Sequence, residues 1–145
     1  MSPAQPTGDP APSDGLLPAS VLDGAERRSL SLYVHVPYCS VRCGYCDFNT
    51  YAAEDFGDGV NRLSYAEDAI RELDLAAGVL TRSGLPARPL STVFFGGGTP
   101  TRLPAEDLAQ ILRAGIERFG IVDGAEVTTE ANPDSVTRED LALLK

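Results

Sequence analysis

The sequence predicts an α/β fold in which parallel strands alternate with helices, as the first part of a larger barrel. Strand-like and helix-like segments alternate along the chain, and each helical connection is long enough for a right-handed crossover between parallel strands. Three strands make an incomplete layer, and the third would have an unpaired edge. The alternative is a complete small domain of three strands, although compact α/β sheets usually need more strands to bury both faces.

Length and composition exclude several classes of protein. The chain has 145 residues, which is enough for one domain with a real core. Its net charge is −9 and it carries no basic cluster, which argues against a nucleic-acid partner. No apolar run approaches the roughly 20 residues that span a bilayer, and no secretory signal is visible. We therefore expect a cytoplasmic protein in a reducing environment.

The N-terminal residues 1–28 differ from the rest of the chain. Five of the 11 prolines lie there, mixed with Ser, Gly and Asp. This composition predicts a disordered tail with one loose turn around residues 19–22. We expect the domain to occupy residues 29–145.

The first strand is expected over residues 30–36, where apolar and polar residues alternate. Tyr33 and His35 fall on its polar face, which is the face that could look into a site. Pro37 ends the strand, and a loop that contains the cysteines follows. Apolar residues at steps of three and four then predict an amphipathic helix over residues 61–81.

The second strand is expected over residues 91–95, a short apolar run typical of a strand buried on both faces. It leads into Gly96-Gly-Gly-Thr-Pro100. A second helix is predicted to begin near Pro104, with acidic residues in its first turn, where the helix dipole favours them. The third strand is expected over residues 126–131, and a capping box at Thr137-Arg-Glu-Asp140 predicts the start of a third helix.

All three cysteines lie within eight residues, at Cys39, Cys43 and Cys46, with the spacing C-x3-C-x2-C. An odd number of crowded thiols argues against a disulfide framework. Three such thiolates can hold three corners of a [4Fe–4S] cube, which leaves one iron free to bind a small chelating molecule. The alternative is a zinc site made with His35, although zinc modules usually carry two pairs of ligands separated by a longer loop.

The segment Tyr33-Val-His-Val-Pro-Tyr-Cys-Ser-Val-Arg-Cys-Gly-Tyr-Cys-Asp-Phe-Asn49 resembles the radical S-adenosylmethionine (SAM) superfamily. Within it, the match is to oxygen-independent coproporphyrinogen III oxidases and the related radical SAM haem chaperones. The resemblance runs over residues 30–145 and implies the first three βα units of a partial (β/α)6 barrel of the TIM type. It also implies that the three cysteines hold a [4Fe–4S] cluster, and that SAM chelates the fourth iron through its methionine amino and carboxylate groups. The reduced cluster would then cleave SAM to methionine and a 5′-deoxyadenosyl radical.

The resemblance further implies which residues contact SAM. A glycine-rich segment that contacts the methionine moiety corresponds to Gly97, Gly98 and Thr99, although a tight turn would explain that segment equally well. A SAM-contacting glutamate corresponds to Glu130, at the carboxyl end of the third strand, where barrels build their sites. Without the resemblance, a solvated carboxylate at a strand end is the simpler interpretation.

Two tyrosines complete the implied cofactor site. Tyr33 matches a SAM-binding tyrosine, and Tyr45 matches an aromatic residue whose backbone faces the adenine. Taken alone, Tyr33 would be a half-buried core residue. We interpret His35, on the same face as Tyr33, as a packing or supporting residue. No catalytic residue is assigned.

Phe48 separates the two branches of the family. The oxidases extend the motif to C-x3-C-x2-C-x-C, and their fourth cysteine would fall at position 48. Asp47-Phe48-Asn49 instead resembles the haem chaperones. This favours a carrier that binds haem and delivers it to apo-haemoproteins over oxidative decarboxylation of coproporphyrinogen, and it leaves open whether the chain is an enzyme. The resemblance also implies an electron donor, and haem-binding elements beyond residue 145.

Overall fold

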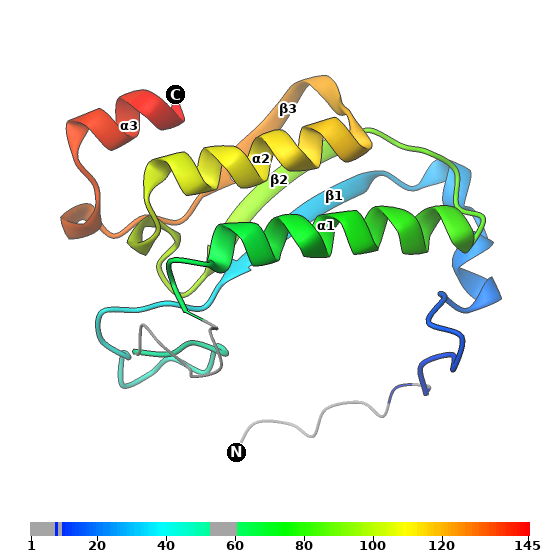
Figure 1. Cartoon of the computed structure of the whole chain (residues 1–145), viewed down its shortest axis with the longest axis horizontal. Coiled ribbons are helices and arrows are strands. Elements are labelled where there is room, and N and C mark those ends of the chain that lie inside the picture. The colour runs from blue at the N-terminus through cyan, green and yellow to red at the C-terminus, as the bar shows by residue number, and fades with distance from the viewer. Residues whose placement is uncertain (1–7, 9, 53–60) are drawn as a thin grey trace.

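In the computed structural model, three parallel strands form one sheet in the order β1-β2-β3, and a helix connects each pair (Figure 1). The structure describes residues 8, 10–52 and 61–145. The elements are β1 (Leu30–Val36), α1 (Tyr65–Arg82), β2 (Leu90–Gly97), α2 (Ala105–Phe119), β3 (Ile121–Thr129) and α3 (Arg138–Leu144). The predicted parallel α/β fold is therefore confirmed.

The described residues also form four short 3-10 turns, of which two precede β1, one lies between β2 and α2 and one lies between β3 and α3. They are η1 (Ala19–Leu22), η2 (Ala25–Arg27), η3 (Pro100–Arg102) and η4 (Pro133–Ser135). The last two follow β2 and β3, so both contribute to the edge of the sheet where the strands end. No helix in the described ranges is long and apolar enough to cross a membrane.

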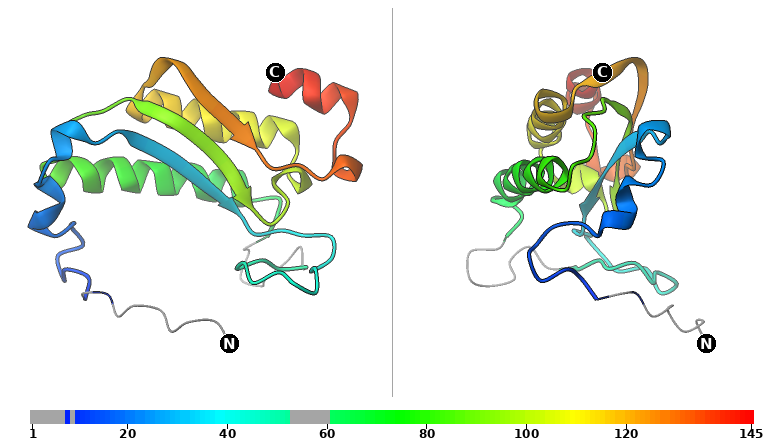
Figure 2. Two further views of the ribbon diagram at one scale, coloured as in Figure 1. Left: turned by 180° about the vertical axis from the view of Figure 1, so that it is seen from behind. Right: turned by 90° about the vertical axis from the view of Figure 1, so that its right-hand side faces the viewer.

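The helices α1 and α2 cover the same face of the sheet, and their apolar sides meet the strands in one core (Figure 2). The predicted alternation in β1 is confirmed, because Val36 is fully buried while Tyr33 is 54% exposed. Val93 of β2 and Ile111 of α2 are also fully buried at the centre of this core.

The expectation that the second strand is buried on both faces is wrong for the described residues. Val93 and Phe95 pack against the helices, but Phe94 points to the other face and is 39% exposed. The apolar run is explained by a single covered face plus Phe94, whose ring stacks on Tyr33. Burial on both faces would need a second layer, which the described part of the chain does not supply.

Several element boundaries differ from the prediction, since β2 runs over Leu90–Gly97 rather than residues 91–95 and β3 ends at Thr129 rather than at residue 131. The first helix begins at Tyr65 rather than at residue 61, because the Asn61 side chain accepts hydrogen bonds from the backbone of Leu63 and Ser64 at 2.8 and 3.1 Å. Such a turn is an alternative to the helix. The third strand begins at Ile121 rather than at residue 126, through an irregular stretch around Gly124.

The predicted capping box of the third helix is confirmed. The Thr137 side chain accepts a hydrogen bond from the Asp140 backbone, and the Asp140 carboxylate accepts from the Thr137 backbone at 2.9 Å. The Thr137 hydroxyl also donates to the Asp140 carboxylate at 2.7 Å, and this bond, together with the one from the Thr137 backbone, lowers the pKa of Asp140. The capping box therefore fixes the start of α3, after the segment that connects it to β3.

The predicted tail and domain boundary stay predictions, but part of that region contacts the domain. The turn η1 coincides with the loose turn expected at residues 19–22. Ala25 is only 1% exposed, and Arg88 donates hydrogen bonds to the carbonyl oxygens of Ala25 and Arg28, both at 3.0 Å. Within the described residues, contact with the domain thus begins before residue 28.

The core makes a direct prediction about stability. Replacing Ile111 by Ala should lower the free energy of unfolding by about 2–5 kcal/mol, because it opens a cavity between α2 and the sheet. Urea unfolding measures the change. The matched control is Leu75→Ala on α1, where the side chain is 62% exposed, and there we expect a change within about 0.5 kcal/mol. Equal losses in both variants would contradict this core.

Candidate cofactor site at the strand ends

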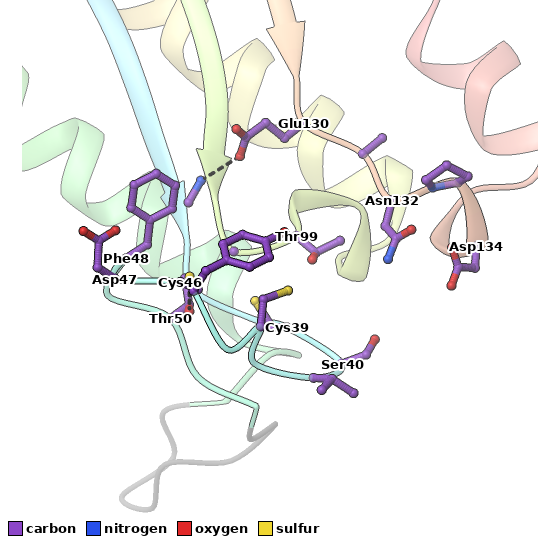
Figure 3. Close-up of a pocket in the computed structure, with 17 residues that line it drawn as sticks. Cys39, Ser40, Cys46, Asp47, Phe48, Thr50, Thr99, Glu130, Asn132 and Asp134 are labelled. Atoms are coloured by element: carbon purple, nitrogen blue, oxygen red, sulfur yellow. Dashed lines mark hydrogen bonds between the residues drawn. The ribbon is translucent and has the colours of Figure 1, made fainter.

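The carboxyl ends of all three strands open into one pocket, with a volume of about 830 Å³. Three segments line it: the cysteine loop after β1, residues 97–99 at the end of β2, and residues 130–134 after β3 (Figure 3). This is the edge of a parallel sheet at which ligands generally bind. The predicted site residues that line this pocket are Cys39, Cys43, Tyr45, Cys46, Gly97, Gly98, Thr99 and Glu130.

The cysteine loop is closed at its base by backbone pairing. The Cys39 backbone donates to the carbonyl of Tyr51 at 2.9 Å, and the Tyr51 backbone donates to the carbonyl of Pro37 at 2.8 Å. A further turn joins the Cys46 backbone to the carbonyl of Cys43 at 3.0 Å. The loop therefore leaves β1 and returns to it, so that its three thiols stay beside the strand ends.

The three thiols are free and differ in exposure. Cys39 and Cys46 are half-buried, whereas Cys43 is exposed. The Cys46 sulfur lies 3.8 Å from the hydroxyl oxygen of Thr50, a side chain that is only 2% exposed. Thr50 is a site residue that the sequence analysis missed. Only its position four residues after the last cysteine could have suggested it.

The donor set fits an iron–sulfur cluster by its chemistry, because soft thiolates within one pocket are the ligands that such clusters take. Among the described residues, no group of three or more His, Cys, Asp or Glu side chains is arranged to hold a single metal ion. A cube presents its irons at separate corners, so its ligands need not converge on one point.

The alternative zinc site has less support, because both ring nitrogens of His35 already have partners. Its Nδ1 lies 2.8 Å from the Tyr33 hydroxyl, and its Nε2 lies 2.9 Å from the carbonyl oxygen of Asn49. His35 thereby connects the open face of β1 to the cysteine loop. It is a supporting residue in this arrangement, as the sequence suggested.

The end of β1 is also tied to α1. The hydroxyl of Tyr65 donates to the carbonyl of His35 at 2.5 Å. Burial raises the pKa of Tyr65, with a smaller contribution from the negative charge of Glu72. The phenol therefore keeps its proton and remains a donor at neutral pH.

Residues 97–99 continue along the end of β1 at close range. The backbone of Gly98 donates to the carbonyl of Val36, and that of Thr99 donates to the carbonyl of Tyr38, both at 2.8 Å. A Cβ atom on Gly98 would lie 2.7 Å from the Tyr38 carbonyl oxygen. Gly97 has a φ of +109°, and a Cβ there would lie 2.6 Å from the ring of His35. Close approach to the backbone of β1's end accounts for Gly98, and the positive φ with the nearby His35 ring accounts for Gly97, whether or not a ligand contacts them.

Glu130 faces this glycine segment from the end of β3. Its carboxylate accepts a hydrogen bond from the Gly97 backbone at 3.1 Å (Figure 3), and its own backbone donates to the carbonyl of Phe95 at 2.9 Å. The carboxylate is thus fixed at the mouth of the pocket. The alternative considered from the sequence, a freely solvated carboxylate at a strand end, does not account for this hydrogen bond to Gly97.

The structure places the two tyrosines differently. Tyr45 lines the pocket and is 90% exposed. Tyr33 lies beside the pocket on the open face of the sheet, where its ring stacks on Phe94 at a centroid distance of 5.9 Å. Burial and, second, the charge of Glu130 raise the pKa of Tyr33. Its exposure shows that Tyr33 is not a core residue of the described chain.

Asn132 and Asp134 also line the pocket, and the sequence analysis missed both. They lie two and four residues after Glu130, with Asn132 just before η4 and Asp134 within it. The available signal was their position after a predicted strand, since loops at the carboxyl ends of parallel strands build the site.

Known proteins resemble the chain over most of its length. The sequence signature of the radical SAM superfamily matches residues 33–145. The Heme chaperone HemW of Mycobacterium tuberculosis is 43% identical over 79% of this chain and 28% of its own length. The Escherichia coli HemW is 37% identical over 74% of this chain and 26% of its own length. Radical S-adenosyl methionine domain-containing protein 1 of Bos taurus, a mitochondrial protein, is 38% identical over 86% and 26% respectively.

A solved structure shows the same arrangement of elements. It is the coproporphyrinogen III oxidase HemN from Escherichia coli, described as a radical SAM enzyme, with a TM-score of 0.68 and 26% sequence identity. The match covers 86% of this chain and 28% of that chain. The chain thus spans less than a third of the length of the proteins it matches.

The close approach at Gly98 makes a testable prediction. Gly98→Ala should lower the free energy of unfolding by about 1–3 kcal/mol, because the new methyl group meets backbone atoms that cannot rotate away. Chemical denaturation measures the loss. Gly44→Ala in the cysteine loop is the control, since a Cβ there meets nothing within 4 Å. A neutral Gly98→Ala would show that the two segments lie farther apart.

Proposed function

The chain belongs to the radical SAM superfamily, and from this premise we propose that it is the cluster- and SAM-binding part of a haem chaperone. Such a protein binds haem and delivers it to apo-haemoproteins. The observation that carries the proposal is the single pocket that brings together the cysteine loop, residues 97–99 and Glu130. We propose residues 29–145 as the incomplete core domain of this protein, and residues 1–28 as its tail.

The superfamily implies a [4Fe–4S] cluster and SAM, and the pocket contains suitable groups for both. Cys39, Cys43 and Cys46 would hold the cluster. When bound, the reduced cluster supplies the electron that cleaves SAM to methionine and a 5′-deoxyadenosyl radical. The chain's own task is to hold these groups in place and to keep water and oxygen away.

The residues around the thiols would bind and orient SAM. The backbone of residues 97–99 would take the methionine moiety, and the Glu130 carboxylate would attract its positive charge. Tyr45 would place its backbone beside the adenine, and Tyr33 would approach from the open face of the sheet. Thr50 would donate a hydrogen bond to the Cys46 thiolate, which stabilises the charged form of the ligand.

Phe48 supports the chaperone over the oxidase. It lines the pocket and is 56% exposed, at the position where the oxidase motif has its fourth cysteine. The HemW relatives point the same way. The structural similarity to HemN favours the second candidate, an oxygen-independent coproporphyrinogen III oxidase. For the haem chaperone we also propose that an apo-haemoprotein accepts the haem, that an electron donor reduces the cluster, and that the protein acts in the cytoplasm.

The cluster proposal predicts the result of anaerobic reconstitution. The chain should take up about four iron and four sulfide, and Cys43→Ala should lose most of both, because one corner of the cube loses its ligand. Ser40→Ala, in the same loop and the same pocket, is the control and should match the wild type. Metal and sulfide analysis measures both. One zinc per chain and no sulfide would contradict the proposal.

The choice between the two candidates predicts the outcome of an activity assay. In a form as long as the relatives, with cluster and SAM present, the chaperone should not convert coproporphyrinogen III to protoporphyrinogen IX without oxygen. It should bind haem, seen as a shift of the haem absorption band on titration. The Escherichia coli oxidase serves as the positive control for turnover. Conversion at a comparable rate would favour the oxidase instead.

A further inference from the structure

A buried hydroxyl joins two walls of the cofactor pocket. Thr101 lies in η3, directly after the glycine segment, and its side chain is 8% exposed. Its hydroxyl oxygen reaches the loop after β3, where it accepts a hydrogen bond from the Asn132 backbone at 3.4 Å. The two residues are 31 positions apart in the sequence.

Ser135 closes this contact into a ring. Its hydroxyl donates to the carbonyl oxygen of Asn132 at 2.7 Å, and its oxygen lies 2.5 Å from that of Thr101. Because the Ser135 proton goes to Asn132, the Thr101 hydroxyl donates to Ser135. Both backbone polar groups of Asn132 are thus held by two side-chain hydroxyls, and each hydroxyl both donates and accepts.

Backbone hydrogen bonds also hold this loop at its two ends, from Glu130 to the Phe95 carbonyl and from Ser135 to the Asn132 carbonyl, both at 2.9 Å. Residues 130–132 lie between the end of β3 and the start of η4, and their side chains are exposed. Glu130 and Asn132 both line the pocket. The Asn132 side chain projects from this loop toward the side of the pocket on which Cys39 lies (Figure 3). Within the described residues, the Asn132 side-chain amide makes no hydrogen bond of its own. It offers one donor group and one acceptor to a ligand.

We propose that Thr101 is a positioning residue for the cofactor pocket, acting through Ser135 and the Asn132 backbone to hold the wall that presents Glu130 and the Asn132 amide to the bound ligand. The inference rests on the proposed function for the identity of that ligand, which is SAM. SAM carries an ammonium group, a carboxylate and ribose hydroxyls, and a carboxylate beside an amide can bind such groups. The hydroxyl is required because it accepts from the Asn132 backbone N–H and donates to Ser135, so its loss removes both hydrogen bonds of the ring.

The first test measures the loop itself and needs no cofactor. In Thr101→Val, amide hydrogen exchange over residues 130–135 should be about tenfold faster, which is the effect of losing one net hydrogen bond. Thr101→Ser keeps the hydroxyl and should stay within about threefold of the wild type. Thr92→Val is the matched control, since the Thr92 hydroxyl in β2 bonds to Ser31 in β1 at 2.8 Å and takes no part in the hydrogen bonds of Thr101, Ser135 and Asn132. It should leave the exchange unchanged.

The second test measures SAM affinity by equilibrium dialysis after anaerobic reconstitution. Thr101→Val should raise the Kd about tenfold, at unchanged iron and sulfide content, while Thr101→Ser and Thr92→Val bind as the wild type does. If Thr101→Val does not fold, Ser135→Ala opens the same ring at a half-buried position and should show the same two effects.

The outcomes separate this inference from the proposed function. Unchanged exchange in both ring variants overturns the positioning role. Faster exchange with an unchanged Kd overturns the claim that the wall contacts the ligand. If the wild type takes up no cluster or binds no SAM, the proposed function fails, while the exchange result still decides whether Thr101 holds the wall.

Discussion

The close approach of residues 97–99 to the end of β1 is the contact on which the site depends. Gly98 and Thr99 donate backbone hydrogen bonds to Val36 and Tyr38, which extends the pairing of β1 and β2 past the end of the regular strands. The cysteine loop begins one residue later, at Cys39. A side chain at position 98 would push the loop and the glycine segment apart, so the thiols lie beside the glycine backbone only because residue 98 has none.

From this contact, hydrogen bonds extend to each wall of the pocket. His35 joins β1 to the cysteine loop through the Asn49 carbonyl. Glu130 joins the glycine segment to β3. Thr101 and Ser135 join the segment after β2 to the loop that carries Asn132. The connections made by Glu130 and Thr101 cross between the ends of β2 and β3, so the parallel register of the sheet sets the relative positions of the groups that a ligand would meet.

Much of the fold could be predicted from the sequence because its signals are local. Alternation in residues 30–36 gave the correct faces of β1, and the capping box gave the start of α3. The errors at the starts of α1 and β3 also have local causes, namely side chains and residues that favour turns. The Asn61 side chain competes with the helix for the backbone of Leu63 and Ser64. The irregular start of β3 contains Asp123 and Gly124, which are typical of turns, so its pairing with β2 was missed.

The sequence by itself determined the three closely spaced thiols, the alternation of strands and helices, and the resemblance to a family with a cluster. These depend on residues near one another along the chain. Only the tertiary structure decided that Glu130 reaches the backbone of Gly97, and that Thr101 and Ser135 hold Asn132. The contacts of Glu130 with Gly97 and of Thr101 with Ser135 join residues more than 30 positions apart, and they require that the packed core bring the strand ends to one edge. No local pattern specifies which hydroxyl will meet which backbone group there.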